Sequence, residues 1–430
     1  MQSTSPICFA LAVGVAIASC APADQPLRLT LEQRGEQLFT EETFDGNGRV
    51  CSTCHELEQF GTITPAFVQD LFERDPDNVL FRPIDSDDGL GISYERLKEH
   101  ATVRVPIQLV AQEATGLSVR KCEAPQDTLV FFNRGNPTVF NVALDQHLMH
   151  DGRENDDLPT QALNAVLTHN EPRRDPTTDE SAAMAAFQES LFSHQALQTF
   201  LNDSAALQLP TGTTASEIRG RTFFEPNRPC GICHSGPLLN RTSEFHPNAV
   251  GLGFESSLVG MEPENPNQKY DWCYFNPETN EIVPGPSGTT KVFERPAADP
   301  GRGLIPGSTA FTLPDGTTAS ESNDVLVNLV GPMFKIPTLW GIPNTAPYFH
   351  DNSAKDLNEV LDHYNFAFAI LLEQGFTEPG CDPNAPVCLS EQDKTDIIAF
   401  LQLLSFDELG IGIPSENGLA RGTTAFSRAK

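Results

Sequence analysis

Apolar residues along this 430-residue chain recur mainly at helical spacing. The clearest example is 390–405, where Ser390 and Asp393 have capping-box spacing and the apolar run IIAFLQLL follows. The same pattern predicts helices at 30–39, 63–73, 181–202, 215–224, 354–365 and 390–405. No long set of alternating strands is expected. The 31 Gly and 34 Pro residues indicate long loops between helices, so the predicted fold class is mostly α.

The first twenty residues form a separate unit. Their apolar run, 7–18, is shorter than the roughly 20 residues that span a bilayer, and it ends in small residues as a secretory signal does. The tetrapeptide 17–20 resembles a lipobox that ends at Cys20, although no Lys or Arg precedes it. We therefore expect 1–20 to be a signal peptide of lipoprotein type, with the mature protein in the periplasm or cell envelope.

Charge limits the classes of partner. The chain has 58 Asp and Glu residues against 28 Lys and Arg, and both nucleic acids and anionic membranes attract cations. We expect no nucleic-acid partner. The balance leaves room for a partner with a basic patch.

Two pentapeptides carry the most specific chemistry, CSTCH at 51–55 and CGICH at 230–234. Two thiols one helical turn apart can bond to the two vinyl groups of a haem, and the adjacent histidine then reaches the iron. We expect two covalently bound haem c groups, held by Cys51, Cys54 and His55 and by Cys230, Cys233 and His234.

The segments before the two motifs are alike. Each runs from a Gly-containing helical stretch through an aromatic residue into a loop, in RGEQLFTEETFDGNGRV and IRGRTFFEPNRP. This weak internal symmetry predicts two cytochrome c-like haem domains with long loops. The expected bounds are 26–206 and 207–430, with a long Gly-, Pro- and acid-rich insertion at about 240–330.

Four cysteines remain in the mature chain outside the motifs: Cys122, Cys273, Cys381 and Cys388. An even remainder in an exported protein fits two disulfides. Cys381 and Cys388 could close a small loop, but spacing alone leaves the pairing open.

Helical geometry distinguishes the two central residues of LDHYN. Tyr364 continues the apolar stripe of Leu357, Val360 and Leu361, which predicts that it points inward. His363 lies about 100° away on the side of acidic residues, so we expect it to face water. A core tyrosine would satisfy the same spacing.

Three segments resemble the di-haem cytochrome c peroxidases and their MauG-like relatives: GNPTVFNVALDQHLMHDGR, CGICHSGPLLNRTSEFHPNAVGLG and FKIPTLWGIPNTAPYFHDNSAKDLNEVLDHY. They occur in order and span most of the mature chain. The resemblance implies an N-terminal haem that reacts with peroxide and a C-terminal haem that stores or relays electrons.

The resemblance also implies site residues. Gln161 and Glu171 have the ten-residue spacing of an amide and a carboxylate that lie over the open face of the N-terminal haem, where they would orient peroxide and move its proton. Reductively activated members carry a histidine shortly after the first motif. Here the next histidine after His55 is His100, outside that window, so the first haem is expected to be open.

For the second haem, the candidate distal ligands are Met261, Met333, His350, His363 and Tyr364. Tyr364 occupies the place of the family's distal ligand, which is methionine in ordinary peroxidases and tyrosine in MauG-like enzymes. A phenolate would stabilise ferric and higher states. This residue favours the MauG-like branch.

The family also binds calcium, and Thr345, Pro347 and Asn136 match its donors, the asparagine with a displacement of one residue. His150 stands where the family usually has the tryptophan between the haems, so the electron route is left open. Ala165 and Trp340 are further departures from the family pattern.

Together these features predict an exported di-haem oxidoreductase that reacts with hydrogen peroxide to form high-valent haem and oxidises a partner protein, as MauG-like enzymes do. One alternative is a cytochrome c peroxidase that takes electrons from a small cytochrome or cupredoxin. Another is a non-enzymatic di-haem electron carrier.

Overall fold

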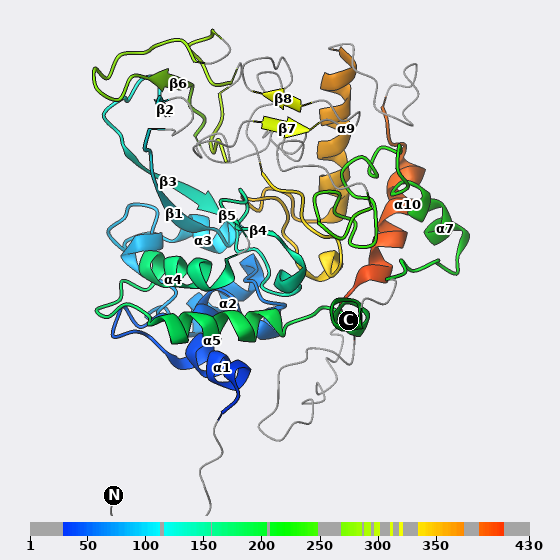
Figure 1. Ribbon diagram of the computed structural model, residues 1–430, viewed down its shortest axis with the longest axis horizontal. Helices are drawn as coiled ribbons and strands as arrows, with labels where there is room; N and C mark the ends of the chain where they lie inside the picture. Colours follow the sequence, from blue (N-terminus) through cyan, green and yellow to red (C-terminus); the bar gives the residue numbers. More distant parts are fainter. Residues whose placement is uncertain are drawn as a thin grey trace, which may run out of the picture.

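A computed structural model of the protein describes residues 29–111, 116–155, 157–203, 207–247, 268–285, 288–293, 296–301, 310–312, 318–320, 334–373 and 387–407 (Figure 1). The signal segment with Cys20, Met261, Met333 and Cys381 lie outside these residues. None of the helices in the described ranges is long and apolar enough to cross a membrane.

Helices dominate the described residues, as expected. They are α1 (Leu31–Glu41), α2 (Pro65–Arg74), α3 (Glu95–His100), α4 (Leu158–His169), α5 (Thr178–Glu189), α6 (Gln195–Asp203), α7 (Ala215–Thr222), α9 (Leu357–Glu373) and α10 (Glu391–Leu401). Ser390 caps α10 in the predicted capping box with Asp393.

The helix before each Cys-x-x-Cys-His motif packs against a helix later in the chain in the same way. A Cβ atom added at Gly35 of α1 would lie 1.9 Å from the carbonyl oxygen of Ala183 in α5. One added at Gly220 of α7 would lie 1.9 Å from the carbonyl oxygen of Asp396 in α10. Figure 1 shows α1 alongside α5 at the base and α7 alongside α10 on the right. The sequence similarity before the motifs thus corresponds to a shared packing device.

The predicted single helix at 181–202 is wrong. It divides into α5 and α6, because Asn141 engages the backbone between them. Its Oδ1 accepts from the N–H of Ser193 at 2.8 Å, and its own N–H donates to the carbonyl of Leu191 at 2.8 Å. Contacts distant in sequence therefore override the helical pattern.

Short strands form as well. Within the described residues there are four antiparallel pairs, namely β1 (Val103–Gln108) with β3 (Leu129–Arg134), β2 (Ser118–Lys121) with β6 (Trp272–Phe275), β4 (His147–Leu148) with β5 (Glu154–Asn155), and β7 (Ala310–Thr312) with β8 (Thr318–Ser320). The alternating signal is weak in β3 because Leu129 and Phe131 are exposed while Val130 and Phe132 are buried, so both faces are apolar.

The β2–β6 pair joins segments far apart in the chain. The Cys122–Cys273 disulfide links them across 151 residues, and Trp272 packs with Val119 and Phe132 in a shared core. The part of the predicted insertion around β6 therefore packs on the N-terminal half. Cys388 is also disulfide-bonded. The domain bounds given above stay predictions.

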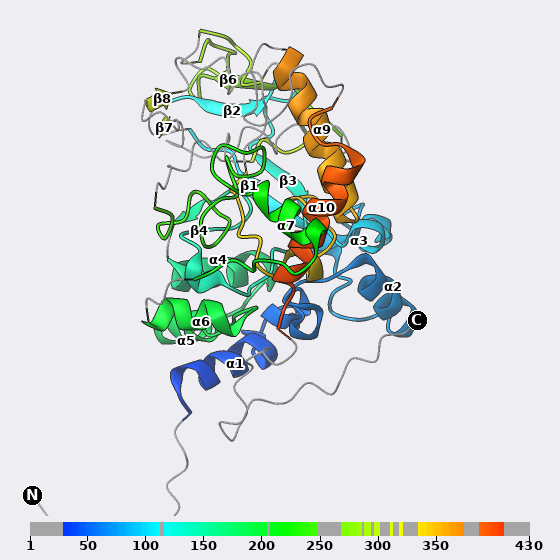
Figure 2. The same ribbon diagram turned by 90° about the vertical axis from the view of Figure 1, so that its right-hand side faces the viewer.

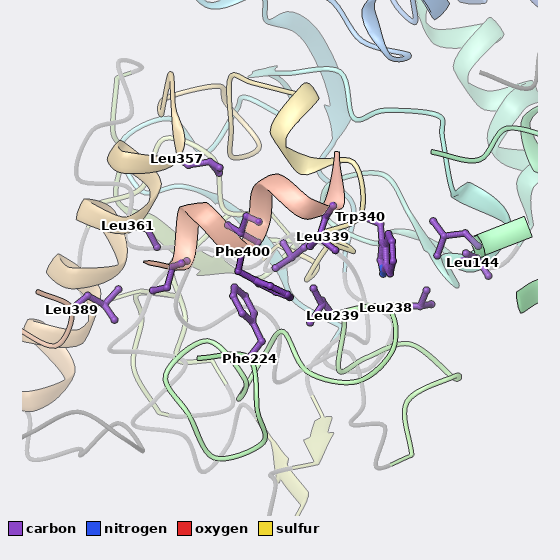
Figure 3. Close-up of a cluster of buried hydrophobic side chains, with 14 of the residues drawn as sticks. Leu144, Phe224, Leu238, Leu239, Leu339, Trp340, Leu357, Leu361, Leu389 and Phe400 are labelled. Atoms are coloured by element: carbon purple, nitrogen blue, oxygen red, sulfur yellow. The ribbon is translucent and has the colours of Figure 1, made fainter. Parts of the chain in front are cut away.

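A larger core lies around α9 and α10 (Figure 3). Phe400 of α10 faces Phe224, which follows α7, and Leu361 of α9 lies at the other side of the same cluster. Cys230 and Cys233 pack at the edge of this core. Figure 2 shows α9 and α10 side by side, and residues of both helices belong to the core against which Cys230 and Cys233 pack.

Candidate haem and peroxide site

Both motifs face one cavity of about 380 Å³, within the roughly 300–1,000 Å³ usual for ligand pockets. His55 lines it from the first motif, and Cys230, Cys233 and His234 line it from the second. Tyr364 closes it from α9. Segments predicted separately as haem sites are therefore brought to the same interior space.

The first motif forms a short 3-10 turn, in which the N–H of His55 donates to the carbonyl of Cys51 at 3.0 Å. Nδ1 of His55 lies 3.1 Å from the carbonyl oxygen of Gly61 and donates to it, which leaves the lone pair on Nε2. Burial lowers the pKa of His55, so the ring is neutral. A buried Arg49–Asp85 ion pair of 2.6 Å holds the chain just before the motif.

The second motif repeats this arrangement. The N–H of His234 donates to the carbonyl of Cys230 at 2.7 Å, and Nδ1 donates to the carbonyl oxygen of Leu239 at 2.9 Å. Burial lowers the pKa of His234 to about 4. Each histidine is therefore a neutral imidazole with its Nε2 lone pair available, which is the form that binds a metal.

The four motif cysteines are free thiols rather than disulfides. Burial raises the pKa of Cys51 and of Cys230 to about 12, so both are protonated at neutral pH. Within the described residues, no group of three His, Cys, Asp or Glu side chains is placed to hold a metal ion by itself. These residues fit covalent attachment of two haem groups better than a zinc site.

Tyr364 points inward, as its spacing predicts. It packs beside Cys230 and Cys233 and lies near Phe368, with ring centroids 6.0 Å apart. Burial raises its pKa, and the nearby thiols raise it further. Among the described residues, no hydrogen bond to its hydroxyl is found.

The expectation that His363 faces water is wrong. Its exposure is 6%, its ring lies 4.6 Å from that of Phe349, and burial lowers its pKa to about 4. The side of α9 that carries His363 is covered by Phe349, which lies in the loop before the helix, while Asp362 next to it is exposed. Spacing along one helix does not reveal that second contact.

The α4 helix presents three residues to the cavity at successive helical turns: Gln161, Ala165 and His169. Nε2 of Gln161 lies 3.6 Å from the sulfur of Met149, which also lines the cavity. Glu171 is exposed and does not line it; its Oε2 accepts from Nδ2 of Asn47 at 3.2 Å. The structure brings Gln161 to the cavity and leaves Glu171 outside.

Sequence reasoning missed His169 and Arg153. Arg153 lines the cavity and binds Asp151 with two hydrogen bonds of 2.9 and 2.8 Å. Burial lowers the pKa of His169 to about 4. A sequence signal existed for His169. Ala165 and His169 lie four and eight residues after Gln161, so the three residues share one face of the helix.

The remaining histidines near the site have separate positions. His100 ends α3 and does not line the cavity; its ring lies 3.9 Å from Glu99. A ring nitrogen of His150 lies 2.9 Å from the carbonyl oxygen of Gly135. His350 stacks on Phe334 with centroids 3.6 Å apart. His150 and His350 line the cavity between the motifs.

The predicted calcium donors Asn136, Thr345 and Pro347 all line the cavity. Nδ2 of Asn136 donates to the carbonyl of Cys54 at 3.1 Å. Calcium binding stays a prediction.

No family model matches the chain. Cytochrome-c peroxidase IdrP1 of Denitromonas iodatirespirans is 27% identical over 236 residues, which cover 54% of this chain and 50% of that protein. Methylamine utilization protein MauG of Methylorubrum extorquens is 32% identical over 82 residues, 19% of this chain and 21% of that protein. The chain thus spans half or less of these curated relatives.

A solved MauG-like protein associated with microbial copper homeostasis aligns over 92% of this chain and 94% of its own, with 19% identity and a TM-score of 0.46. The likeness in sequence does not depend on this alignment. By the curated matches, the chain is similar to cytochrome c peroxidases and to MauG over part of its length.

Proposed function

We propose that this protein is an exported di-haem c-type oxidoreductase that reacts with hydrogen peroxide and oxidises a partner protein. The observation that carries the proposal is the shared cavity, where His55, His234 and Tyr364 come together from three distant segments. Two haems bound there would supply redox-active iron able to cleave peroxide and to share the oxidising equivalents.

The chain's own residues divide the task. The neutral imidazoles of His55 and His234 are the proposed proximal ligands, and the buried hydroxyl of Tyr364 is the proposed distal ligand of the second haem. Gln161 is positioned to orient peroxide with its amide. Glu171 is the proton-transfer residue that the family resemblance implies.

The test is an electronic spectrum of the ferric holoprotein before and after hydrogen peroxide. We expect the spectrum to contain a signal from high-spin haem. After peroxide is added, this signal should be replaced by a new spectrum that persists. A spectrum without any high-spin component and without a peroxide response would identify an electron carrier and contradict the proposal.

The match to IdrP1 favours a second function, reduction of peroxide with electrons from a small cytochrome or cupredoxin. The formal net charge of −30 would suit a donor with a basic face. Rapid peroxide-dependent oxidation of such a reduced donor would support this second function. Covalent modification of a partner's side chains under the same conditions would support the first.

A further inference from the structure

The segments around the two motifs carry opposite charge. Residues 31–62, around the first motif, hold seven Asp and Glu against two Arg. Residues 215–241, around the second motif, hold four Arg against two Glu. The second motif therefore lies in a basic segment of a chain whose formal net charge is −30. A local reversal of charge favours contact with a negatively charged surface.

An arginine stands two residues before the first cysteine of each motif, and the two arginines have different surroundings. Arg49 is 1% exposed and forms the buried ion pair with Asp85. Arg228 is exposed and forms no ion pair with the described residues. The charge of Arg49 is therefore neutralised inside the fold, whereas the charge of Arg228 faces solvent.

Two arginines flank Ile232, the residue between the cysteines of the second motif. The N–H of Ile232 donates to the carbonyl of Arg228 at 3.2 Å. The carbonyl of Ile232 accepts from Nη1 of the half-buried Arg241 at 3.1 Å. These bonds hold both arginines beside the motif.

Arg221 extends the positive charge onto the end of α7. It is exposed and likewise forms no ion pair with the described residues. The N–H of Gly231 donates to the carbonyl of Phe223 at 3.0 Å, which ties the end of α7 to the motif. Figure 1 shows α7 at the outer edge of the molecule, beyond α10.

The acidic neighbours of α7 are largely engaged in other contacts. The carboxylate of Glu217 accepts from the N–H groups of Thr213 and Thr214 at the helix cap. Asp396 is buried and pairs with Arg219. Within 215–241, the exposed acidic residue is Glu225. The segment therefore keeps a positive surface.

We propose that Arg221, Arg228 and Arg241 form a docking patch beside the second motif for an acidic face of the partner protein. This inference rests on the proposed function and specifies the charge of the partner. The net charge of the whole chain would favour a basic partner. However, exposed charges farther apart than about 8 Å are largely screened at physiological ionic strength, so the charges in contact decide which face docks.

The position of the patch suits electron transfer to the second haem. Ile218 is 51% exposed and lies three residues before Arg221 on the same side of α7, so it adds apolar contact area. Cys230 and Cys233 line the cavity directly behind the patch arginines. Each docked partner loses one electron to the enzyme. Two such electrons and two protons reduce one hydrogen peroxide to two waters.

The experiment measures binding of two oxidised probe proteins to the ferric holoprotein without peroxide, by calorimetry at about 0.1 M ionic strength. The probes are plastocyanin, an acidic cupredoxin, and a basic mitochondrial cytochrome c. We expect wild type to bind plastocyanin more tightly than the cytochrome. Arg228→Glu should weaken plastocyanin binding by about tenfold or more, because an attractive contact becomes repulsive.

The matched control is Arg34→Glu, the same change of charge in the helix before the first motif. Arg34 is exposed on α1, which lies apart from α7 in both views, so plastocyanin binding should stay within about twofold of wild type (Figures 1 and 2). The difference between wild type and Arg228→Glu should shrink as salt is added, which a merely structural effect would not do. Arg228→Gln is the milder variant if Arg228→Glu loses haem.

Three results would overturn the inference. They are plastocyanin binding in Arg228→Glu equal to that of wild type, tighter binding of the basic cytochrome than of plastocyanin by wild type, and no plastocyanin binding by wild type. All three are measured without peroxide. A wild-type protein that does not respond to peroxide would instead overturn the proposed function.

Discussion

The two motif regions share their attachment geometry and differ in what faces each motif. In both, a glycine in the helix before the motif packs against a backbone carbonyl of a later helix, and the motif histidine donates from Nδ1 to a backbone carbonyl five or six residues on. In the first region, α4 presents Gln161 and His169 to the cavity. In the second, α9 presents Tyr364 within an apolar core.

Under the proposed function, this difference would give the two haems unlike roles. The similar attachment segments would fix where each haem binds, and the helix that faces each haem would decide its chemistry. Polar side chains that hold and move protons suit the haem that meets peroxide. A buried tyrosine in apolar surroundings suits a capped haem that shares the oxidation without meeting peroxide.

Removing a haem attachment site should have the largest effect on haem content and on the peroxide response. Comparing the two sites should show which region reacts with peroxide. The double variant Cys51→Ser, Cys54→Ser should lose one haem and the peroxide response. The matched variant Cys230→Ser, Cys233→Ser should lose the other haem. Intact mass and the haem spectrum measure both, and a wild-type protein with fewer than two haems would contradict the account.

The buried charge network of the first region should contribute more stability than the partly exposed pair of the second. Arg134 binds Asp151 at 2.6 Å and Asp299 at 2.7 Å, and its side chain is 3% exposed. Arg134→Met removes the guanidinium that pairs with the buried Asp299 and leaves Asp151 with Arg153 alone. It should lower the free energy of unfolding by about 3–5 kcal/mol. Urea denaturation of the holoprotein measures this.

The control is Arg219, which binds Asp396 at 2.6 Å but is 53% exposed. Arg219→Met should cost only about 1 kcal/mol, because water reaches the Arg219 guanidinium and the buried Asp396 keeps hydrogen bonds from Ser216 and Gln392. Equal losses in the two variants would show that burial does not distinguish the networks.

Substitutions at Gly35 and Gly220 test the close helix packing that the two regions share. A methyl group at Gly35 or Gly220 would collide with a backbone carbonyl, which cannot move aside as a flexible side chain can. Gly35→Ala and Gly220→Ala should each lower the free energy of unfolding by roughly 1–3 kcal/mol, as overpacking does. Thermal unfolding measures both, and a stabilised variant would contradict the helix-pair geometry.

The smallest expected effect is on acid stability, through the cap of α5. Arg174 lowers the pKa of Glu180 from 4.5 to about 2, with help from Thr177 at the N-cap. The contribution is therefore complete above about pH 5 and is lost as pH falls toward 2. Glu180→Gln should cost about 1 kcal/mol at pH 7 and less at pH 3; a loss that is the same at both values would disprove the linkage.

Much of the site could be predicted from local sequence. The two Cys-x-x-Cys-His motifs, the capping box at Ser390 and the inward Tyr364 each depend on residues within a few turns of one another. The helices before the motifs were also visible, because their glycines and aromatic residues recur at similar positions.

The rest depends on contacts that cross the chain. Asn141 interrupts the helical pattern near 190, and Phe349 covers His363 from outside its helix. The β2–β6 pair and the Cys122–Cys273 disulfide join residues 151 apart. The ten-residue spacing indicates Glu171, whereas the cavity is lined by the continuous face of α4 that carries Gln161 and His169.

The most direct test of the unlike roles is electron paramagnetic resonance of the ferric holoprotein, for wild type and Tyr364→Phe. The account predicts one high-spin and one low-spin haem in wild type, with only the low-spin signal changed by the substitution. Two low-spin haems in wild type, or two signals that the substitution leaves unchanged, would contradict it.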